Sequence, residues 1–218
     1  GVAPDVKLQH ARVLGKCGGS LSDIADAIVW SAGGSVPGVP ENQNPVDVIN
    51  MSLGGSGSCG STYQNAIDQA VANGTAVVVA AGNESQPAAN SRPANCDNVI
   101  SVAASDEQGS KASFSNYGSA VDVTAPGADI VSTVDSGATT PAGADYAAYQ
   151  GTSMAAPHVA GVAALMIANG TADPAAIEQQ LKDTARTMPG TCAEGCGAGL
   201  VDAAAALGAT GAVAGRPE

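Results

Sequence analysis

The chain has 218 residues, with 8 Lys or Arg against 20 Asp or Glu, so its formal charge at pH 7 is −12. Nucleic acids and anionic membrane surfaces are normally bound by basic patches, so this charge argues against both as partners. Apolar residues make up 44 % of the chain, and its most apolar stretch, residues 159–168, is too short to cross about 30 Å of hydrocarbon. We therefore expect one globular domain over residues 1–207, followed by a tail or the start of a linker at 208–218.

Short apolar runs alternate along the chain with segments of helical periodicity. This alternation is typical of strands that are buried on both faces and connected by crossover helices. The fold class is therefore α/β, with a mainly parallel sheet. The strands are expected at residues 7–14, 46–51, 76–81, 99–104 and 120–124.

Helices are expected where apolar residues recur at helical spacing between a capping residue and a glycine. The expected helices are residues 21–28 after the cap Ser20, residues 63–71 up to Gly74, a long apolar helix from Ser153, a helix capped by Asp173, and residues 201–207. The stretch at 132–145, between the last strand and the long apolar helix, is polar and rich in glycine. No repeat or linker divides the domain.

The five cysteines lack the C-x-x-C spacing of a structural zinc site, which favours disulfide bonds. Cys192 and Cys196 could close a small loop, and Cys59 and Cys96 lie in turn-rich segments that could meet at one end of the sheet. We predict these two pairs, which leave Cys17 over. An odd cysteine in an oxidised protein indicates a partner outside the chain, and the alternative is a buried free thiol.

Ser153 lies where a loop turns into a helix. The first turn of a helix has free backbone N–H groups and the positive end of the dipole, so an anion that develops there is stabilised. This position suits a nucleophile. A Thr-Ser pair before an apolar helix is also a common helix cap, so the position alone leaves both interpretations open.

Several motifs together resemble the subtilisin-like serine proteases, in the order of that family. Residues 151–161, Gly-Thr-Ser-Met-Ala-Ala-Pro-His-Val-Ala-Gly, resemble the nucleophile motif of the family. Further similar segments are the strand at 1–15, the substrate-binding strand at 46–55, the oxyanion segment at 80–83, and the stretches 114–118 and 125–127. The resemblance covers nearly the whole chain and implies a three-layer α/β/α fold. The cysteine positions resemble a secreted bacterial branch of the family whose disulfides brace this domain, which implies an extracellular location.

The resemblance implies a chemical role for two residues. Ser153 would be the acylating nucleophile of a serine endopeptidase, and the side-chain amide of Asn83 would form an oxyanion hole with the backbone N–H of Ser153. A neutral amide can lie in a water-poor site without a counter-charge and still donate to the developing oxyanion. The alternative for Asn83 is a turn residue that tolerates left-handed backbone.

Two edges for an extended substrate also follow from the resemblance. An extended peptide can add as a strand to an exposed edge, and glycines there let the two backbones approach. The side-chain pocket would have small, apolar walls, which predicts a preference for bulky apolar or uncharged residues before the scissile bond. The expected substrate-binding residues are Ser52, Leu53, Gly54 and Gly55 on one edge, Gly18, Gly19 and Ser20 on the other, and Ala80, Ala81 and Gly82 as pocket walls beside Leu53.

A general base for the serine is not found among the two histidines of the chain. A serine is a poor nucleophile unless a histidine oriented by a carboxylate takes its proton. His158 follows Ser153 on the same helix and is structural in the family motif, and His10 is expected as a buried residue of the strand at 7–14. In the family, the segment that carries Asp and His precedes the part that resembles this chain, so the chain corresponds to about the last three-quarters of the catalytic domain.

The missing segment also bears on folding, because the family's aspartate strand lies beside the strand expected at 7–14. Without it, neighbouring strands lose hydrogen bonds. We expect a bound N-terminal fragment that carries Asp and His and pairs with Cys17. This chain alone is then expected to be inactive. The resemblance also implies calcium as a structural ion, for which no ligands are named. Carbonyl groups near residues 94–98 could hold a more weakly bound cation.

Two other classes of function compete with a protease. A pseudoprotease or inert remnant would bind extended peptides through the same edges without cleaving them. A nucleotide-binding α/β domain is excluded, because neither G-x-G-x-x-G nor a P-loop sequence follows a strand.

Overall fold

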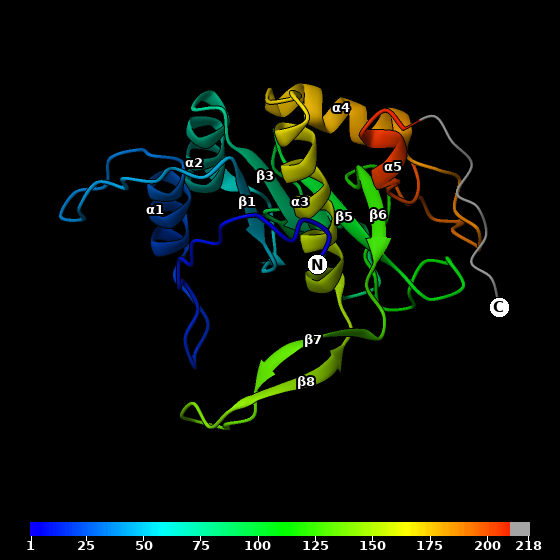
Figure 1. The fold of residues 1–218 in the computed structure, drawn as a ribbon, viewed down its shortest axis with the longest axis horizontal. Coiled ribbons are helices and arrows are strands. Elements are labelled where there is room, and N and C mark those ends of the chain that lie inside the picture. The colour runs from blue at the N-terminus through cyan, green and yellow to red at the C-terminus, as the bar shows by residue number, and fades with distance from the viewer. Residues whose placement is uncertain (210–218) are drawn as a thin grey trace.

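The computed structural model describes residues 1–209, which form a central sheet between two layers of helices (Figure 1). The sheet contains four parallel strands in the order β1-β3-β5-β6. Their bounds are Val48–Met51, Ala76–Ala80, Ile100–Ser105 and Val123–Pro126. The central strands β3 and β5 are buried along their whole length, as strands covered on both faces must be. Four of the five expected strands are thus confirmed, although β6 begins three residues later than expected.

Five helices surround this sheet, and each of them lies in a segment where a helix was expected. They are α1 (Leu21–Ser31), α2 (Gly60–Ala72), α3 (Thr152–Ala168), α4 (Pro174–Thr184) and the short α5 (Ala203–Ala206). The caps behave as predicted: the Ser20 hydroxyl accepts the N–H of Asp23 at 3.1 Å, and the Asp173 carboxylate accepts that of Ala176 at 2.9 Å.

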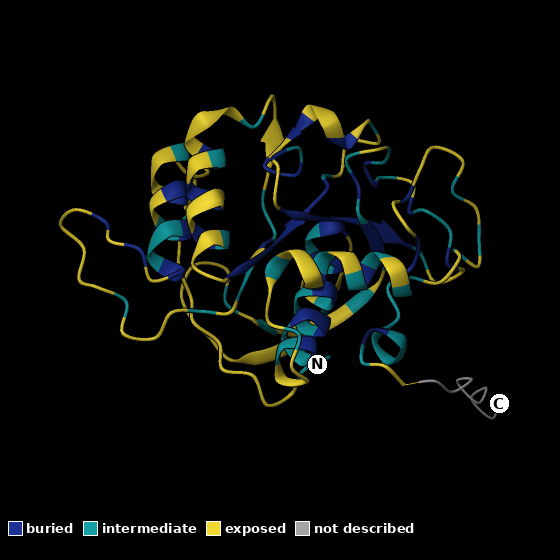
Figure 2. Cartoon of the chain, turned by 90° about the horizontal axis from the view of Figure 1, so that it is seen from above, coloured by how far each residue is buried: buried dark blue, intermediate teal, exposed yellow. Residues whose placement is uncertain are grey.

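The two faces of the sheet carry alternate residues of the same strands. Val77 and Val79 pack with α1 and α2, whereas Val78 and Ala80 pack with α3 and α4. Figure 2 shows the buried strands between the two helical layers, whose outer faces are exposed. The predicted three-layer α/β/α architecture is therefore confirmed.

Residues 7–14 form no strand, so this prediction is wrong. The segment is extended coil without secondary structure, and Leu8 is 79 % exposed. Strand β1 is the edge of the sheet, and no described strand lies between it and residues 7–14, so their backbone groups have no ladder to join. His10 is exposed, which corrects its expected place as a buried core histidine.

The glycine-rich stretch at 132–145 contains structure that the sequence analysis missed. Strands β7 (Ile130–Asp135) and β8 (Ala144–Tyr149) form an antiparallel hairpin that extends away from the sheet (Figure 1). Its exposed side chains include Val131, Tyr146 and Tyr149. A second antiparallel pair joins β2 (Gly55–Ser56) to β4 (Ser91–Arg92). The one-turn 3-10 helix Ala88–Asn90 directly precedes β4.

Both predicted disulfides, Cys59–Cys96 and Cys192–Cys196, are present. Cys17 is a free thiol in the described part of the chain and is exposed, so the alternative of a buried thiol is wrong. Among residues 1–209, no helix combines the length and the apolar character that crossing a membrane would require. The expected tail at 208–218 lies, beyond residue 209, outside the described residues.

Candidate active site

Ser153 lies in the first turn of α3, half-buried, with Gly151 as the residue before the helix. Its hydroxyl donates to the backbone oxygen of Ser52 at 3.4 Å, and the Ser52 hydroxyl donates to the backbone oxygen of Ser153 at 2.7 Å. This pair joins the start of α3 to the carboxyl end of β1. The backbone N–H of Ser153 donates to no group of the described residues and is one of the free donors of a helix start.

Thr152 fixes the orientation of the Asn83 amide. The Asn83 Oδ1 atom accepts hydrogen bonds from the backbone N–H of Thr152 at 2.8 Å and from its hydroxyl at 3.0 Å. A backbone N–H can only donate, so the atom that faces it is the oxygen, and the Nδ2 donors of Asn83 stay free for another acceptor. Thr152 is fully buried, and its hydroxyl also accepts the N–H of Gly82 at 3.1 Å.

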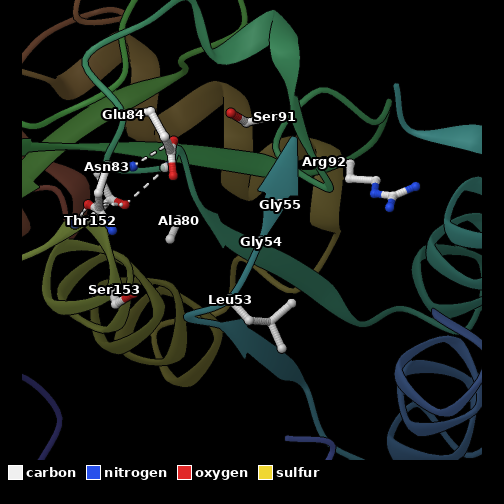
Figure 3. Close-up of a pocket in the computed structure, with 11 residues that line it drawn as sticks. Leu53, Gly54, Gly55, Ala80, Asn83, Glu84, Ser91, Arg92, Thr152 and Ser153 are labelled. Carbon is white, nitrogen blue, oxygen red and sulfur yellow. Dashed lines mark hydrogen bonds between the residues drawn. The ribbon is translucent and has the colours of Figure 1, made fainter. Parts of the chain in front are cut away.

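A pocket opens beside these two residues (Figure 3). Asn83, Thr152 and Ser153 lie together at one end of it, and the Arg92 side chain points away from them. The lining residues are Leu53, Gly54, Gly55, Ala80, Gly82, Asn83, Glu84, Ser91, Arg92, Thr152 and Ser153.

Glycine is required at position 82 in this arrangement. Gly82 has a φ of +107°, and a Cβ there would collide with the Nδ2 atom of Asn116. Asn116 is fully buried behind the pocket, so the turn that carries Asn83 lies directly against it.

The structure brings most of the predicted site residues together. Besides Asn83 and Ser153, the pocket contains Leu53, Gly54, Gly55, Ala80 and Gly82, and Ser52 contacts Ser153. Two groups of predicted substrate-binding residues lie elsewhere. Ala81 is fully buried in a small apolar cluster and does not line the pocket. Gly18 closes the turn that begins at Gly15, and after Gly19 the chain reaches Ser20, which acts as the cap of α1.

Four lining residues were not predicted. Thr152 lies inside the nucleophile motif and Glu84 directly follows Asn83, so their positions in the sequence were the available signal. No sequence pattern marks Ser91 and Arg92 as pocket residues. They reach the pocket because they form the two-residue strand β4, which pairs with β2.

Neither histidine is placed to take a proton from Ser153. The Nδ1 atom of His158 lies 2.8 Å from the backbone oxygen of Met154, one turn back on α3, and donates to it. His10 lies in the exposed segment before α1. Within residues 1–209, no three His, Cys, Asp or Glu side chains cluster as metal ligands would.

Comparison with known proteins places this site in a family. The model of the subtilase family matches residues 1–199. An extracellular protease of Xanthomonas campestris is 61 % identical over 209 residues, which are 95 % of this chain and 36 % of that protein. An extracellular basic protease of Dichelobacter nodosus is 49 % identical over 96 % of this chain and 36 % of its own length. The chain thus spans little more than a third of these relatives.

Solved structures agree with the sequence relatives. A protease from Pseudoalteromonas arctica has a TM-score of 0.88 and 57 % identity, over 91 % of this chain and 61 % of that one. A cold-adapted subtilisin-like serine proteinase has a TM-score of 0.71 and 32 % identity, over 87 % of this chain and 64 % of its own. With the family match over nearly all of its length, the chain belongs to the subtilase family.

Proposed function

We propose that this chain is the nucleophile-bearing part of a secreted serine endopeptidase. The observation that carries the proposal is the pair of free donors, Asn83 Nδ2 and the backbone N–H of Ser153, beside the Ser153 hydroxyl at the start of α3. Both named relatives are extracellular proteases, which supports secretion and peptide-bond hydrolysis.

The proposed reaction begins when the Ser153 oxygen attacks the carbonyl carbon of the scissile peptide bond and its proton passes to a base. The carbonyl oxygen then becomes an oxyanion, which the amide of Asn83 and the backbone N–H of Ser153 would stabilise. Collapse of this intermediate breaks the C–N bond, the amine leaves with the proton from the base, and an acyl-enzyme remains on Ser153. Water then hydrolyses the ester by the same steps.

The base is proposed to come from a segment that precedes this chain in a longer protein. Neither His158 nor His10 contacts Ser153, and β1 has an open edge where a further strand can pair. We propose that this segment supplies the catalytic Asp and His, and that it forms a disulfide with the exposed thiol of Cys17.

An extended polypeptide is the proposed substrate. Residues 52–54 lie between β1 and β2 outside any ladder, so their backbone groups can pair with a substrate strand. The turn of Gly18, Gly19 and Ser20 is proposed as the second edge, and Ala81 as support for the pocket wall.

The pocket is expected to prefer bulky, uncharged side chains before the scissile bond. Its walls include Leu53 and Ala80, and the Glu84 carboxylate is engaged by the N–H of Asn83 at 3.0 Å and by Nδ2 of Asn116 at 2.9 Å. These two bonds weaken the attraction of Glu84 for a cationic side chain. A peptide library should therefore show cleavage mainly after apolar residues. Cleavage mainly after Lys or Arg would contradict this pocket assignment.

We also propose a weak, structural calcium site near residues 94–98. Calcium prefers oxygen ligands, and the buried Oδ1 atom of Asn95 accepts no hydrogen bond from the described residues. Backbone oxygens of the same turn would complete the set, and no step of the reaction passes through this ion. Removal of calcium by a chelator should lower the melting temperature of the protein. An unchanged melting temperature would contradict the proposed calcium site.

The proposed function is tested by labelling the protein with a fluorophosphonate, which reacts only with activated serines. The protein used is the continuous polypeptide that contains the preceding segment and this chain. An adduct on the peptide that contains Ser153, absent in Ser153→Ala, is expected. If the folded protein binds an extended peptide but forms no adduct, the proposed protease is wrong, and the chain is a pseudoprotease that binds peptides without cleaving them.

A further inference from the structure

We propose that Asn116 is a positioning residue that holds the oxyanion donor Asn83 in place and couples it to the side-chain pocket. The inference rests on the proposed function and adds a residue that does not contact the substrate. Asn116 lies in the segment after β5, about thirty residues from Asn83 in the sequence, and its side chain is fully buried.

The Asn116 side chain binds both ends of the turn that carries Asn83. Its Oδ1 atom accepts the backbone N–H of Glu84 at 3.0 Å and that of Gln86 at 3.1 Å. Its Nδ2 atom donates to the backbone oxygen of Ala81 at 2.9 Å. Backbone N–H groups only donate and backbone oxygens only accept, so these contacts fix the orientation of the amide. One side chain therefore closes the loop on either side of Asn83.

The same amide nitrogen reaches two residues of the pocket. It lies 2.9 Å from Oε2 of Glu84 and 2.9 Å from the hydroxyl oxygen of Ser91, so its two hydrogens are shared among three acceptors. Glu84 Oε2 in turn accepts the backbone N–H of Asn83. The oxyanion donor and the pocket wall are thus joined through a single buried group.

Backbone contacts alone do not set the position of this turn. The N–H of Asn116 donates to the oxygen of Gly82 at 3.0 Å, and the N–H of Ser85 donates to that of Phe114 at 2.9 Å. Asn83 and Glu84 lie between these two bonds, and side chains bind their N–H groups. The N–H of Asn83 donates to the Glu84 carboxylate, and the N–H of Glu84 donates to Asn116. A shift of about 1 Å in a catalytic group can lower a rate about 100-fold, so loss of Asn116 should lower kcat.

The experiment is a double-mutant cycle between Asn116→Ser and Asn83→Ala in the continuous protease. If Asn116 acts through Asn83, Asn116→Ser should lower kcat roughly 10- to 100-fold when Asn83 is present. It should lower kcat less than about threefold in the Asn83→Ala background, because the donor it positions is then absent. Equal losses in both backgrounds would show a general structural role and overturn the inference.

Thr124→Val is the matched control. Thr124 is also fully buried, and its hydroxyl donates to the backbone oxygen of Cys196 at 2.9 Å, away from the turn that carries Asn83. This variant should lower the melting temperature and leave kcat unchanged. A loss of kcat in Thr124→Val equal to that in Asn116→Ser would count against the inference.

Ser91→Ala provides a second variant should Asn116→Ser fail to fold. It removes only the hydroxyl on the pocket side and leaves the other bonds of Asn116 in place. Because Ser91 itself lines the pocket, the effect that acts through Asn116 is measured by the same cycle: Ser91→Ala should lower kcat less than is expected of Asn116→Ser, and that loss should shrink in the Asn83→Ala background. An equal change of kcat in both backgrounds would overturn the proposed coupling. Absence of any activity in the unmutated protein would overturn the proposed function, and the inference with it.

Discussion

Replacement of Asn83 by Ala is expected to lower kcat by about 10²–10³-fold and to leave KM nearly unchanged, the loss known for the equivalent donor of subtilisin. The physical reason is that the Asn83 amide is needed only when the carbonyl oxygen acquires charge. The substrate's ground-state carbonyl gains little from it, so binding is preserved. Steady-state kinetics on a peptide substrate with the continuous protease measure both parameters.

Asn44→Ala serves as the control, because Asn44 is exposed and does not line the pocket. It should retain full activity. A variant Asn83→Ala with an unchanged kcat would show that this amide does not stabilise the oxyanion, and the site assignment would then be wrong.

Thr152→Val separates the presence of the amide from its orientation. The variant keeps the backbone N–H that binds Asn83 Oδ1 but removes the hydroxyl that binds it at 3.0 Å. One of the two bonds that orient the amide remains, and the N–H of Gly82 loses its acceptor as well, so we expect a loss of kcat of roughly tenfold or somewhat more, the net value of one to two hydrogen bonds. The order of effects, with Asn83→Ala the larger, is part of the prediction.

The sequence predicted the strands, the main helices and the Cys192–Cys196 disulfide because each depends on local signals, whereas Cys59–Cys96, 37 residues apart, followed from the turn-rich positions of the two cysteines. Short, fully apolar runs rich in valine, such as Ala76–Ala80, are typical of strands buried on both faces, and the caps Ser20 and Asp173 mark helix starts by their own chemistry. Ser153 and Asn83 came from motifs that are contiguous in the chain. The role of Thr152 in orienting the Asn83 amide could not be foreseen, because it depends on how α3 packs against the turn that carries Asn83.

The failures have a common physical cause: each depends on which segments pair or pack together, and no single stretch of sequence shows this. Residues 7–14 have the composition of a strand, but a strand exists only with a hydrogen-bonded neighbour, and no described strand pairs with this segment. The hairpin β7–β8 forms within a polar stretch because Ile130–Asp135 and Ala144–Tyr149 pair with each other. Asn116 acts through three segments, so no local pattern marks it as important.

The chain without its proposed preceding segment is expected to react with a fluorophosphonate about 10⁶-fold more slowly than the continuous protease, the loss that removal of the base causes in subtilisin. Ser153 then keeps its oxyanion donors but has no group to take its proton. Within residues 1–209, its hydroxyl donates to the backbone oxygen of Ser52 alone, and this oxygen cannot act as a base. Mass spectrometry of the peptide that contains Ser153 measures the rate.

Addition of the preceding segment should restore labelling and also stabilise the chain. A strand that pairs with β1 would satisfy backbone groups of an open edge, and each such group is worth about 1–3 kcal/mol when buried. An intact mass without reducing agent should show the two pieces joined, and Cys17→Ser should abolish that link while non-covalent association remains. Because Cys17 is exposed, this substitution is not expected to disturb the core. Equal labelling of the isolated chain would mean that a base lies within it, and the proposed division of the catalytic residues between two segments would be wrong.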